Sequence, residues 1–414
     1  MQWLHEELPN LVGKGVLSME TAEKLRQHYG EVENGGGRRW AMVVFGVLGA
    51  ALIGAGIILL LAHNWEELSR RVPAVISFLP LLMAVGLAGF VLTKRPQSTA
   101  WREGVGMFWA LAIGATISLV GQTYHLDGDF PSFVLTWSLA GLPIVYLLNS
   151  SSAAILFWVG ATAWTGSDSW MRREDVWFWP LVALAVPHLW MVLRENRYRP
   201  RVELMLWVLA GCLAFGIGFS LDHVGGRAWI PVFTSYFATL YMLGALWFDE
   251  GRSFWQRPLQ TIGALGVIAL AIALTFDDAW KWGWRMNLMK TPLIIWPLIA
   301  LGLWATTWTK RNVVALLFGS LPVLAMICVT LEVVGLVLMN LYVLGLGTAL
   351  IWLGVRDRRL GVVNLGLLVM SALIIAKFFD RDMSFVLRGL AFIGVGVGFL
   401  VTNMVILRKT RGAR

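Results

Sequence analysis

Charged residues are scarce in this chain. Only 14% of its 414 residues are Asp, Glu, Lys or Arg, whereas 57% are hydrophobic and the mean hydropathy is +0.68. This composition leaves too little polar surface to cover a water-soluble globule, so it indicates an integral membrane protein. The apolar residues form continuous runs without the two-residue alternation of a lipid-facing strand, which argues against a membrane β-barrel and predicts an all-α fold.

Cysteine and recognisable catalytic motifs are also scarce. The two cysteines, Cys212 and Cys328, fall inside apolar runs, so we expect neither a disulfide framework nor a thiolate metal site. No HExxH, CxxC, Walker, GxSxG or strand-linked GxGxxG motif occurs. The motifs therefore identify no reaction. We assign no metal ligand and no cofactor, and whether the protein is an enzyme stays open.

The net charge of +9 does not indicate a nucleic-acid partner. The basic residues stand in short clusters at the ends of apolar segments, which is the pattern that sets the orientation of a membrane protein.

From Trp40 onward the chain alternates between apolar segments and short polar connections. The segments lie near residues 40–62, 75–92, 104–120, 133–148, 150–166, 176–193, 204–221, 230–248, 259–275, 293–309, 313–330, 333–355, 360–379 and 385–407. Each is close to the roughly 20 residues that a bilayer requires. The sequence therefore predicts a polytopic transmembrane helical bundle of about 14 spans, as long as each segment crosses.

The fifth segment, 150–166, is the weakest, because it is short, begins in polar residues and has no basic anchor. With all segments crossing and the N-terminus inside, the inner connections hold 20 Lys and Arg residues and the outer connections nine. Removing the fifth segment changes these counts to 12 and 17. The positive-inside rule thus favours 14 spans with both termini in the cytoplasm.

Residues 1–37 form the largest predicted soluble piece. They contain no run apolar enough for a signal peptide. Ser18 can cap a helix from Met19 to Tyr29, and three glycines at 35–37 read as a hinge. We predict a two-helix cytoplasmic lobe in residues 1–37, followed by the bundle in residues 38–414.

One polar stretch, Gly121–Phe130, interrupts the apolar runs. It contains Gln122, Tyr124, His125, Asp127 and Asp129. With both termini inside and every segment crossing, it lies on the outer side of the membrane. The first outer connection, with His63, Glu66 and Glu67, faces the same way. Imidazoles and carboxylates suit proton exchange or a divalent ion. These eight residues are our candidates for coupling protons or substrate, although a purely structural network fits them as well.

A second group of charges lies near the C-terminus. Lys377 stands at the outer end of the thirteenth segment, with Asp380 after it and Arg388 one turn into the fourteenth. A salt bridge that fixes this hairpin is the simplest interpretation. A pocket for a lipid phosphate is the alternative. Other polar residues inside segments, including His188 and Asn340, each read as interhelical hydrogen-bonding residues.

Three stretches carry a family resemblance. These are Leu11–Glu23, Ala62–Arg70 with the sequence AHNWEELSR, and GQTYHL at 121–126 followed by Gly128 and Asp129. They resemble a bacterial family called domain of unknown function 2157, over roughly the first 150 residues. The resemblance implies a multi-pass inner-membrane protein and brings no activity with it.

Three functional hypotheses stay open. A transporter or permease with an outer-facing polar vestibule is the first, although the sequence shows no convincing pair of broken helices with charge at the midplane. A membrane enzyme acting on a lipid-linked substrate at the outer face is the second. A structural or sensory membrane subunit is the third. We expect membrane lipid and a small-molecule or lipid-linked substrate as partners, expect no nucleic acid, and predict no particular protein partner.

Overall fold

The computed structural model describes residues 71–172, 177–222, 228–248, 254–280, 294–330 and 332–378, together with residues 12, 13, 15, 17–22, 24, 386, 389, 390, 393 and 397. The chain divides into two compact units, Met1–Val75 and Ile76–Arg414. Nearly all described residues belong to the second unit, and the packing below concerns that unit.

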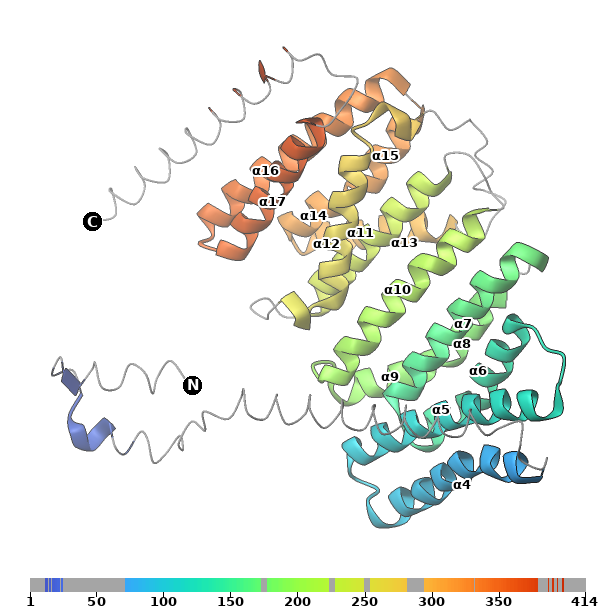
Figure 1. Cartoon of the computed structure of the whole chain (residues 1–414). Helices are drawn as coiled ribbons and strands as arrows, with labels where there is room; N and C mark the ends of the chain where they lie inside the picture. The colour runs from blue at the N-terminus through green and yellow to red at the C-terminus, as the bar shows by residue number, and fades with distance from the viewer. Residues whose placement is uncertain are drawn as a thin grey trace. The chain divides into compact units, whose positions relative to one another are not determined.

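The described part of the chain is all-helical, as predicted, with fourteen α-helices and no strand (Figure 1). The helices are α4 (Arg71–Lys94), α5 (Thr99–Tyr124), α6 (Phe130–Leu147), α7 (Ser151–Arg172), α8 (Phe178–Leu184), α9 (Val186–Asn196), α10 (Pro200–Asp222), α11 (Trp229–Trp247), α12 (Pro258–Ala273), α13 (Ile295–Thr309), α14 (Val313–Gly319), α15 (Leu321–Thr330), α16 (Glu332–Arg356) and α17 (Leu360–Phe378). Two 3₁₀-helices, η3 (Phe254–Gln256) and η4 (Asp277–Trp280), flank α12.

Each predicted apolar segment from 75–92 to 360–379 coincides with one helix or with two consecutive helices. Seven described helices are long and apolar enough to cross a membrane, namely α4, α5, α6, α10, α11, α16 and α17. The first predicted segment, 40–62, lies outside the described residues, as does most of the last, 385–407. In the N-terminal region, the Thr21 amide donates to Ser18 Oγ at 3.2 Å, which is the cap expected there.

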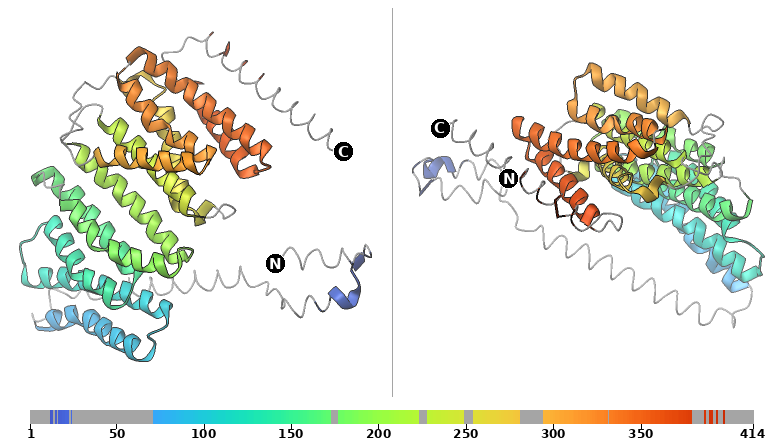
Figure 2. Two further views of the ribbon diagram at one scale, coloured as in Figure 1. Left: turned by 180° about the vertical axis from the view of Figure 1, so that it is seen from behind. Right: turned by 90° about the horizontal axis from the view of Figure 1, so that it is seen from above.

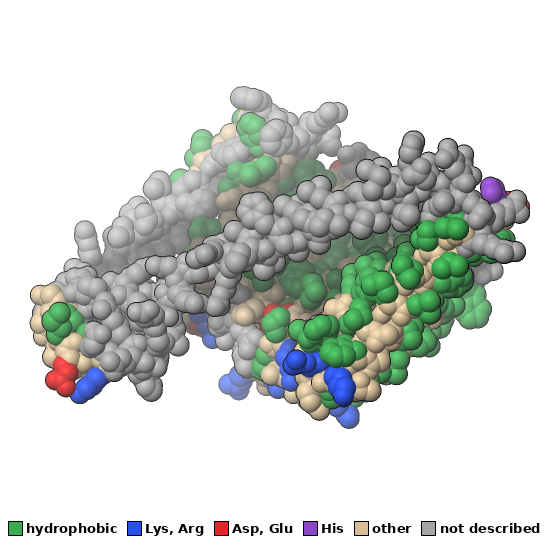
Figure 3. Space-filling view, turned by 60° about the horizontal axis from the view of Figure 1, so that its bottom comes forward, with side chains coloured by type: hydrophobic (Ala, Val, Ile, Leu, Met, Phe, Trp, Pro, Cys, Tyr) green, Lys and Arg blue, Asp and Glu red, His purple; other side chains and the backbone are tan. Residues whose placement is uncertain are grey.

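The helices carry apolar side chains on their outer surfaces. On α4, for example, Leu79, Leu82 and Phe90 are exposed, as suits a helix that faces lipid. Figure 3 shows Lys and Arg side chains gathered at one end of such an apolar face. This arrangement is typical of a membrane boundary, where basic residues meet the headgroup region.

Buried residues form two main hydrophobic clusters. The first lies among α4 to α10 and includes Phe157, Trp158 and Phe178. The second lies among α11 to α17 and includes Met242 and Phe318. The weakly predicted fifth segment folds as α7, and it packs closely against α6 and α10 inside the first cluster. In the second, α16 and α17 run side by side, as Figures 1 and 2 show.

Two apolar segments are each split into a pair of short helices, which the sequence analysis did not predict. Segment 176–193 consists of α8 and α9, separated by Ala185 alone. Segment 313–330 consists of α14 and α15, separated by Ser320 alone. In each pair the first helix has seven residues, and the second carries a proline, Pro187 or Pro322, at its second position. Proline lacks the amide hydrogen that would continue the helix, which explains both breaks. Each break is a local one, because Ala185 (φ −101°, ψ −2°) and Ser320 (φ −79°, ψ −19°) stay in the right-handed helical region.

One Trp and one Tyr side chain stabilise each break. At the first, the Trp158 indole donates to the Val182 carbonyl at 3.2 Å, and the Tyr146 hydroxyl donates to the Leu184 carbonyl. At the second, the Trp304 indole donates to Leu316 O at 3.2 Å, and the Tyr342 hydroxyl donates to Leu317 O at 2.9 Å. Neighbouring helices thus bind carbonyls beside those that proline leaves unpaired.

Candidate functional site

The polar stretch 121–130 ends one helix and begins the next. His125 follows α5 in the left-handed conformation, with φ 49° and ψ 46°, and its side chain is exposed. Asp129 is the N-cap of α6, where its Oδ1 accepts from the Ser132 amide at 2.8 Å. Both residues therefore have a local role in the turn between the helices.

The other candidates in this stretch, Gln122, Tyr124 and Asp127, are also exposed. His63, Glu66 and Glu67 lie outside the described residues. The vestibule predicted from these two connections, and the coupling role of all eight residues, therefore stay predictions.

Lys377 binds the end of α12. Its ammonium donates to the Thr275 carbonyl at 2.8 Å and lies 4.6 Å from the centre of the Phe276 ring. Asn340 Nδ2 donates to the same carbonyl at 3.4 Å, which confirms the interhelical role predicted for Asn340. A cation is stabilised at a helix C-terminus because the last carbonyls carry partial negative charge. Asp380 and Arg388 lie outside the described residues, so the salt bridge and the lipid-phosphate pocket stay predictions.

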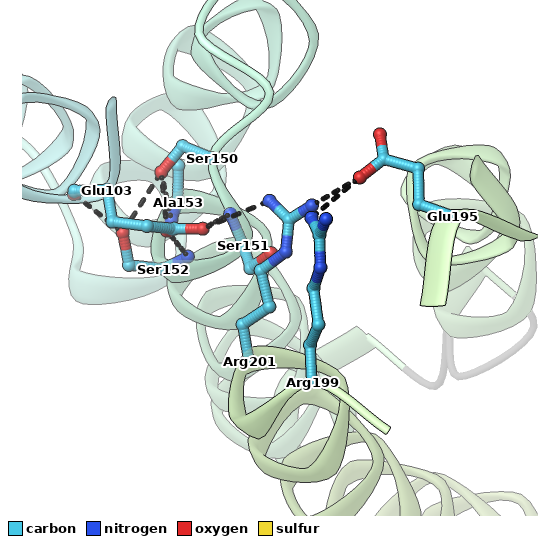
Figure 4. Close-up of polar contacts among 8 residues, drawn as sticks. All are labelled: Glu103, Ser150, Ser151, Ser152, Ala153, Glu195, Arg199 and Arg201. Atoms are coloured by element: carbon cyan, nitrogen blue, oxygen red, sulfur yellow. Dashed lines mark hydrogen bonds and ion pairs between the residues drawn. The ribbon is translucent and has the colours of Figure 1, made fainter. Parts of the chain in front are cut away.

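The most connected polar cluster in the described residues surrounds Glu103, which the sequence analysis did not single out. Glu103 lies near the start of α5, and its carboxylate reaches the first turn of α7 (Figure 4). The Ser151 amide donates to Oε1 at 3.0 Å, and the Ser152 amide donates to Oε2 at 2.8 Å. The Ser150 hydroxyl donates to Oε2 at 3.2 Å. The negative charge thus binds amides that a helix N-terminus otherwise leaves unpaired.

Two arginines and a second carboxylate extend this cluster. Arg201 Nη2 donates to Glu195 Oε2 at 2.8 Å, and Arg199 Nη1 donates to the same oxygen at 2.9 Å. Arg201 Nη1 lies 3.8 Å from Glu103 Oε1. The side chains of Arg201 and Glu103 are 12% and 22% exposed, so this ion pair is shielded more than a surface pair.

Several buried polar atoms near this cluster have no hydrogen-bond partner among the described residues. They are Arg102 Nε, Asn149 Oδ1, Ser151 Oγ, Arg201 Nε and both ring nitrogens of His188. A buried polar group without a partner loses its hydration without compensation, so each of these atoms has unused hydrogen-bonding capacity, and the His188 ring alone among them can also take up a proton.

His188 is the most enclosed member of this set. Its side chain is 0% exposed, and it is the third residue of α9, just after the break at Ala185. The Tyr146 ring meets the imidazole edge-on at 6.4 Å between centres. The prediction of an interhelical hydrogen bond for His188 was wrong, because neither nitrogen has a partner in the described structure.

The sequence gives only a weak sign of this site. Pro187 next to His188 marks a histidine at a helix break, and an acidic residue in the first turns of an apolar segment is unusual. Glu103 and Ser152 are 49 residues apart, however, so only the packing of α5 against α7 brings them together.

The described residues contain no group of three or more His, Cys, Asp and Glu side chains that could hold a metal ion. The carboxylates, guanidinium groups, hydroxyls and one imidazole of the Glu103 cluster can take part in proton exchange and hydrogen bonding.

Fold and site together define a multi-pass helical membrane protein with a shielded polar cluster at one end of its first hydrophobic core. Residues 9–154 match a family model described as "Predicted membrane protein (DUF2157)", which confirms the resemblance seen in the sequence. Comparison with curated proteins and with solved structures gave no match.

Proposed function

We propose that this protein is a transporter of the bacterial inner membrane, with about 14 spans and both termini in the cytoplasm. The observation that carries the proposal is the pair of broken helices, α8–α9 and α14–α15. One pair lies in each of the two main hydrophobic clusters. In both pairs the first helix has seven residues and the second has proline at its second position.

Broken helices inside a membrane protein support transport for a physical reason. A break leaves backbone groups unpaired at membrane depth, which lipid cannot satisfy, so the break must be enclosed by protein or line a cavity. Transporters use such breaks in their repeated halves to bind substrate and coupling ions near the midplane. The first break follows the seven residues of α8, which is about 10 Å from the start of that helix.

The aromatic donors at the breaks fit this function. In the described state, one Trp and one Tyr donate to carbonyls beside each break. Rotation of such a side chain would open its carbonyl to a substrate, and the return of the side chain would pair the carbonyl again. The outer-face candidates Gln122 to Asp129 would form the vestibule that leads to the break.

Alternating access can be tested without knowing the substrate. Cys212 and Cys328 are replaced by Ala, and Ala185 is then changed to Cys. Ala185 is 0% exposed and lies at the break between α8 and α9. We expect an impermeant maleimide to label this cysteine both in right-side-out and in inside-out vesicles, because each conformation opens the break to one side.

The matched control is Ala238→Cys in the same background. Ala238 is also 0% exposed but lies within the continuous helix α11, so it should resist labelling from both sides. If Ala185→Cys resists labelling in both preparations as Ala238→Cys does, the bundle is a static scaffold and the transport proposal fails.

A further inference from the structure

His188 is a buried titratable group that no hydrogen bond explains. Its ring is fully enclosed, and neither nitrogen has a partner among the described residues. The imidazole carries one proton donor and one acceptor, and burying both beside the break in α8–α9 without a partner costs free energy that an apolar side chain would avoid.

Charged and titratable groups approach His188 from several helices. Glu103 on α5, Arg201 on α10 and Glu195 on α9 lie close enough to interact with the ring electrostatically. Tyr146 on α6 faces the ring, but its hydroxyl donates to the Leu184 carbonyl. At this end α7 contributes the hydroxyls of Ser151 and Ser152, and α8 has no titratable residue. The surroundings thus hold two carboxylates and the guanidinium group of Arg201, while Arg199 binds Glu195 at 2.9 Å.

We propose that His188 is the proton-binding group of the transport cycle and that Glu103 is the carboxylate that stabilises its charged form. This inference rests on the transport function proposed above. A proton from water on one side forms an N–H bond at an unpaired ring nitrogen. After the conformational change, that bond breaks and the proton passes to water on the other side, so nothing else is consumed.

The geometry of Arg201 explains how Glu103 can serve two partners. Arg201 makes its close hydrogen bond to Glu195 at 2.8 Å, whereas its distance to Glu103 is 3.8 Å. A positive imidazole can therefore attract Glu103 while Arg201 stays paired with Glu195. When the ring is neutral, Glu103 continues to bind the α7 amides, so neither protonation state leaves a buried charge alone.

The test measures the Ala185→Cys labelling of inside-out relative to right-side-out vesicles as a function of pH. Taking the ratio cancels the pH dependence of the thiol reaction. A single protonation changes a two-state ratio by up to about tenfold per pH unit. We expect this pH dependence with His188 present and a ratio that changes less than about twofold in His188→Gln.

Asp357→Asn is the control, because Asp357 is an exposed titratable residue that pairs with Arg356 just after α16. It should keep the full pH dependence. Glu103→Gln retains an acceptor oxygen for α7 but loses the charge, and it should move the midpoint to lower pH. Thermal unfolding of each purified variant checks that it is folded.

The inference is overturned if folded His188→Gln keeps the pH dependence. It is also overturned if His188→Gln unfolds while Glu103→Gln leaves the midpoint unchanged. Labelling of Ala185→Cys from both sides with no effect of either variant would preserve the transport function and reject only the proton site. Absence of labelling would reject the transport function itself.

Discussion

At the scale of single residues, two carboxylates perform the same task in different ways. Asp129 binds an amide of the helix that it begins, three residues ahead. Glu103 binds amides of a helix that begins 48 residues later. The first interaction is a local capping rule that a sequence can show, whereas the second exists only in the packed bundle.

Asp129 provides a test of local capping against function. Asp129→Ala removes the acceptor for the Ser132 amide and should lower the free energy of unfolding by about 1 kcal/mol. Asp129→Asn should stay close to the parent, because Asn is an equally good N-cap. Thermal unfolding in detergent measures the stability of both variants. An Asn variant that is stable but inactive would show that the carboxylate has the functional role predicted from the sequence.

Glu103→Ala should lower the free energy of unfolding more than Asp129→Ala does. It leaves the Ser151 and Ser152 amides unpaired and deprives Arg201 of one carboxylate, so we expect a loss of about 3 kcal/mol. The control is Asp357→Ala. A hydrogen bond from Arg356 lowers the pKa of Asp357, but the pair is on the surface and its loss should leave unfolding unchanged. Equal effects of the two substitutions, measured in the same denaturation assay, would contradict the structural role of Glu103.

At the scale of the elements, close approach of helices determines which glycines matter. Where α11 crosses α12, a Cβ on Gly263 would collide with backbone atoms of Phe237 and Tyr241, and one on Gly244 would collide with the backbone of Gln260. The two helices therefore pack through glycine on both sides, a contact that larger residues would prevent.

Gly263→Ala tests this contact. The added methyl group cannot be accommodated by rotating a side chain, since its neighbours are backbone atoms, so we expect destabilisation of about 2 kcal/mol. Gly302→Ala in α13 is the matched control, because no atom lies within 4 Å of the position that its methyl group would occupy. It should stabilise the helix by up to about 1 kcal/mol. We expect the two substitutions to shift the unfolding midpoint in opposite directions. A Gly263→Ala variant with an unchanged midpoint would contradict the close packing.

At the scale of the whole molecule, the open question is how many helices cross the membrane. Seven described helices meet the length and hydropathy of a span, whereas α7, α12, α13 and the two broken pairs are shorter or less apolar. The proposed threading counts all of them, and it gives an odd number of crossings between the 125–129 turn and the 357–359 turn.

Reporter insertions decide this count. Alkaline phosphatase inserted after Gly128 should be active, because the proposed threading puts this turn outside. Alkaline phosphatase inserted after Arg358 should be inactive, and a reporter that works only in the cytoplasm should be active there, because an odd number of crossings separates the two sites. Phosphatase activity at both sites would mean that one counted segment, with α7 the first candidate, does not cross.

The sequence alone determined the class of the protein. Low charge, continuous apolar runs and basic clusters at their ends led to a helical membrane protein, since hydrocarbon leaves few other ways to satisfy a backbone. The positions of the helices followed from hydropathy, and the Asp129 and Ser18 caps followed from local rules.

The tertiary structure decided where polar groups meet. The breaks at Ala185 and Ser320 are signalled by prolines, but whether a proline kinks, breaks or merely begins a helix depends on which neighbours bind the carbonyls near it. The Glu103 cluster and the isolation of His188 depend on contacts between residues far apart in the chain. Hydropathy reports how each segment partitions between water and lipid, and it carries no information on which buried side chains face one another.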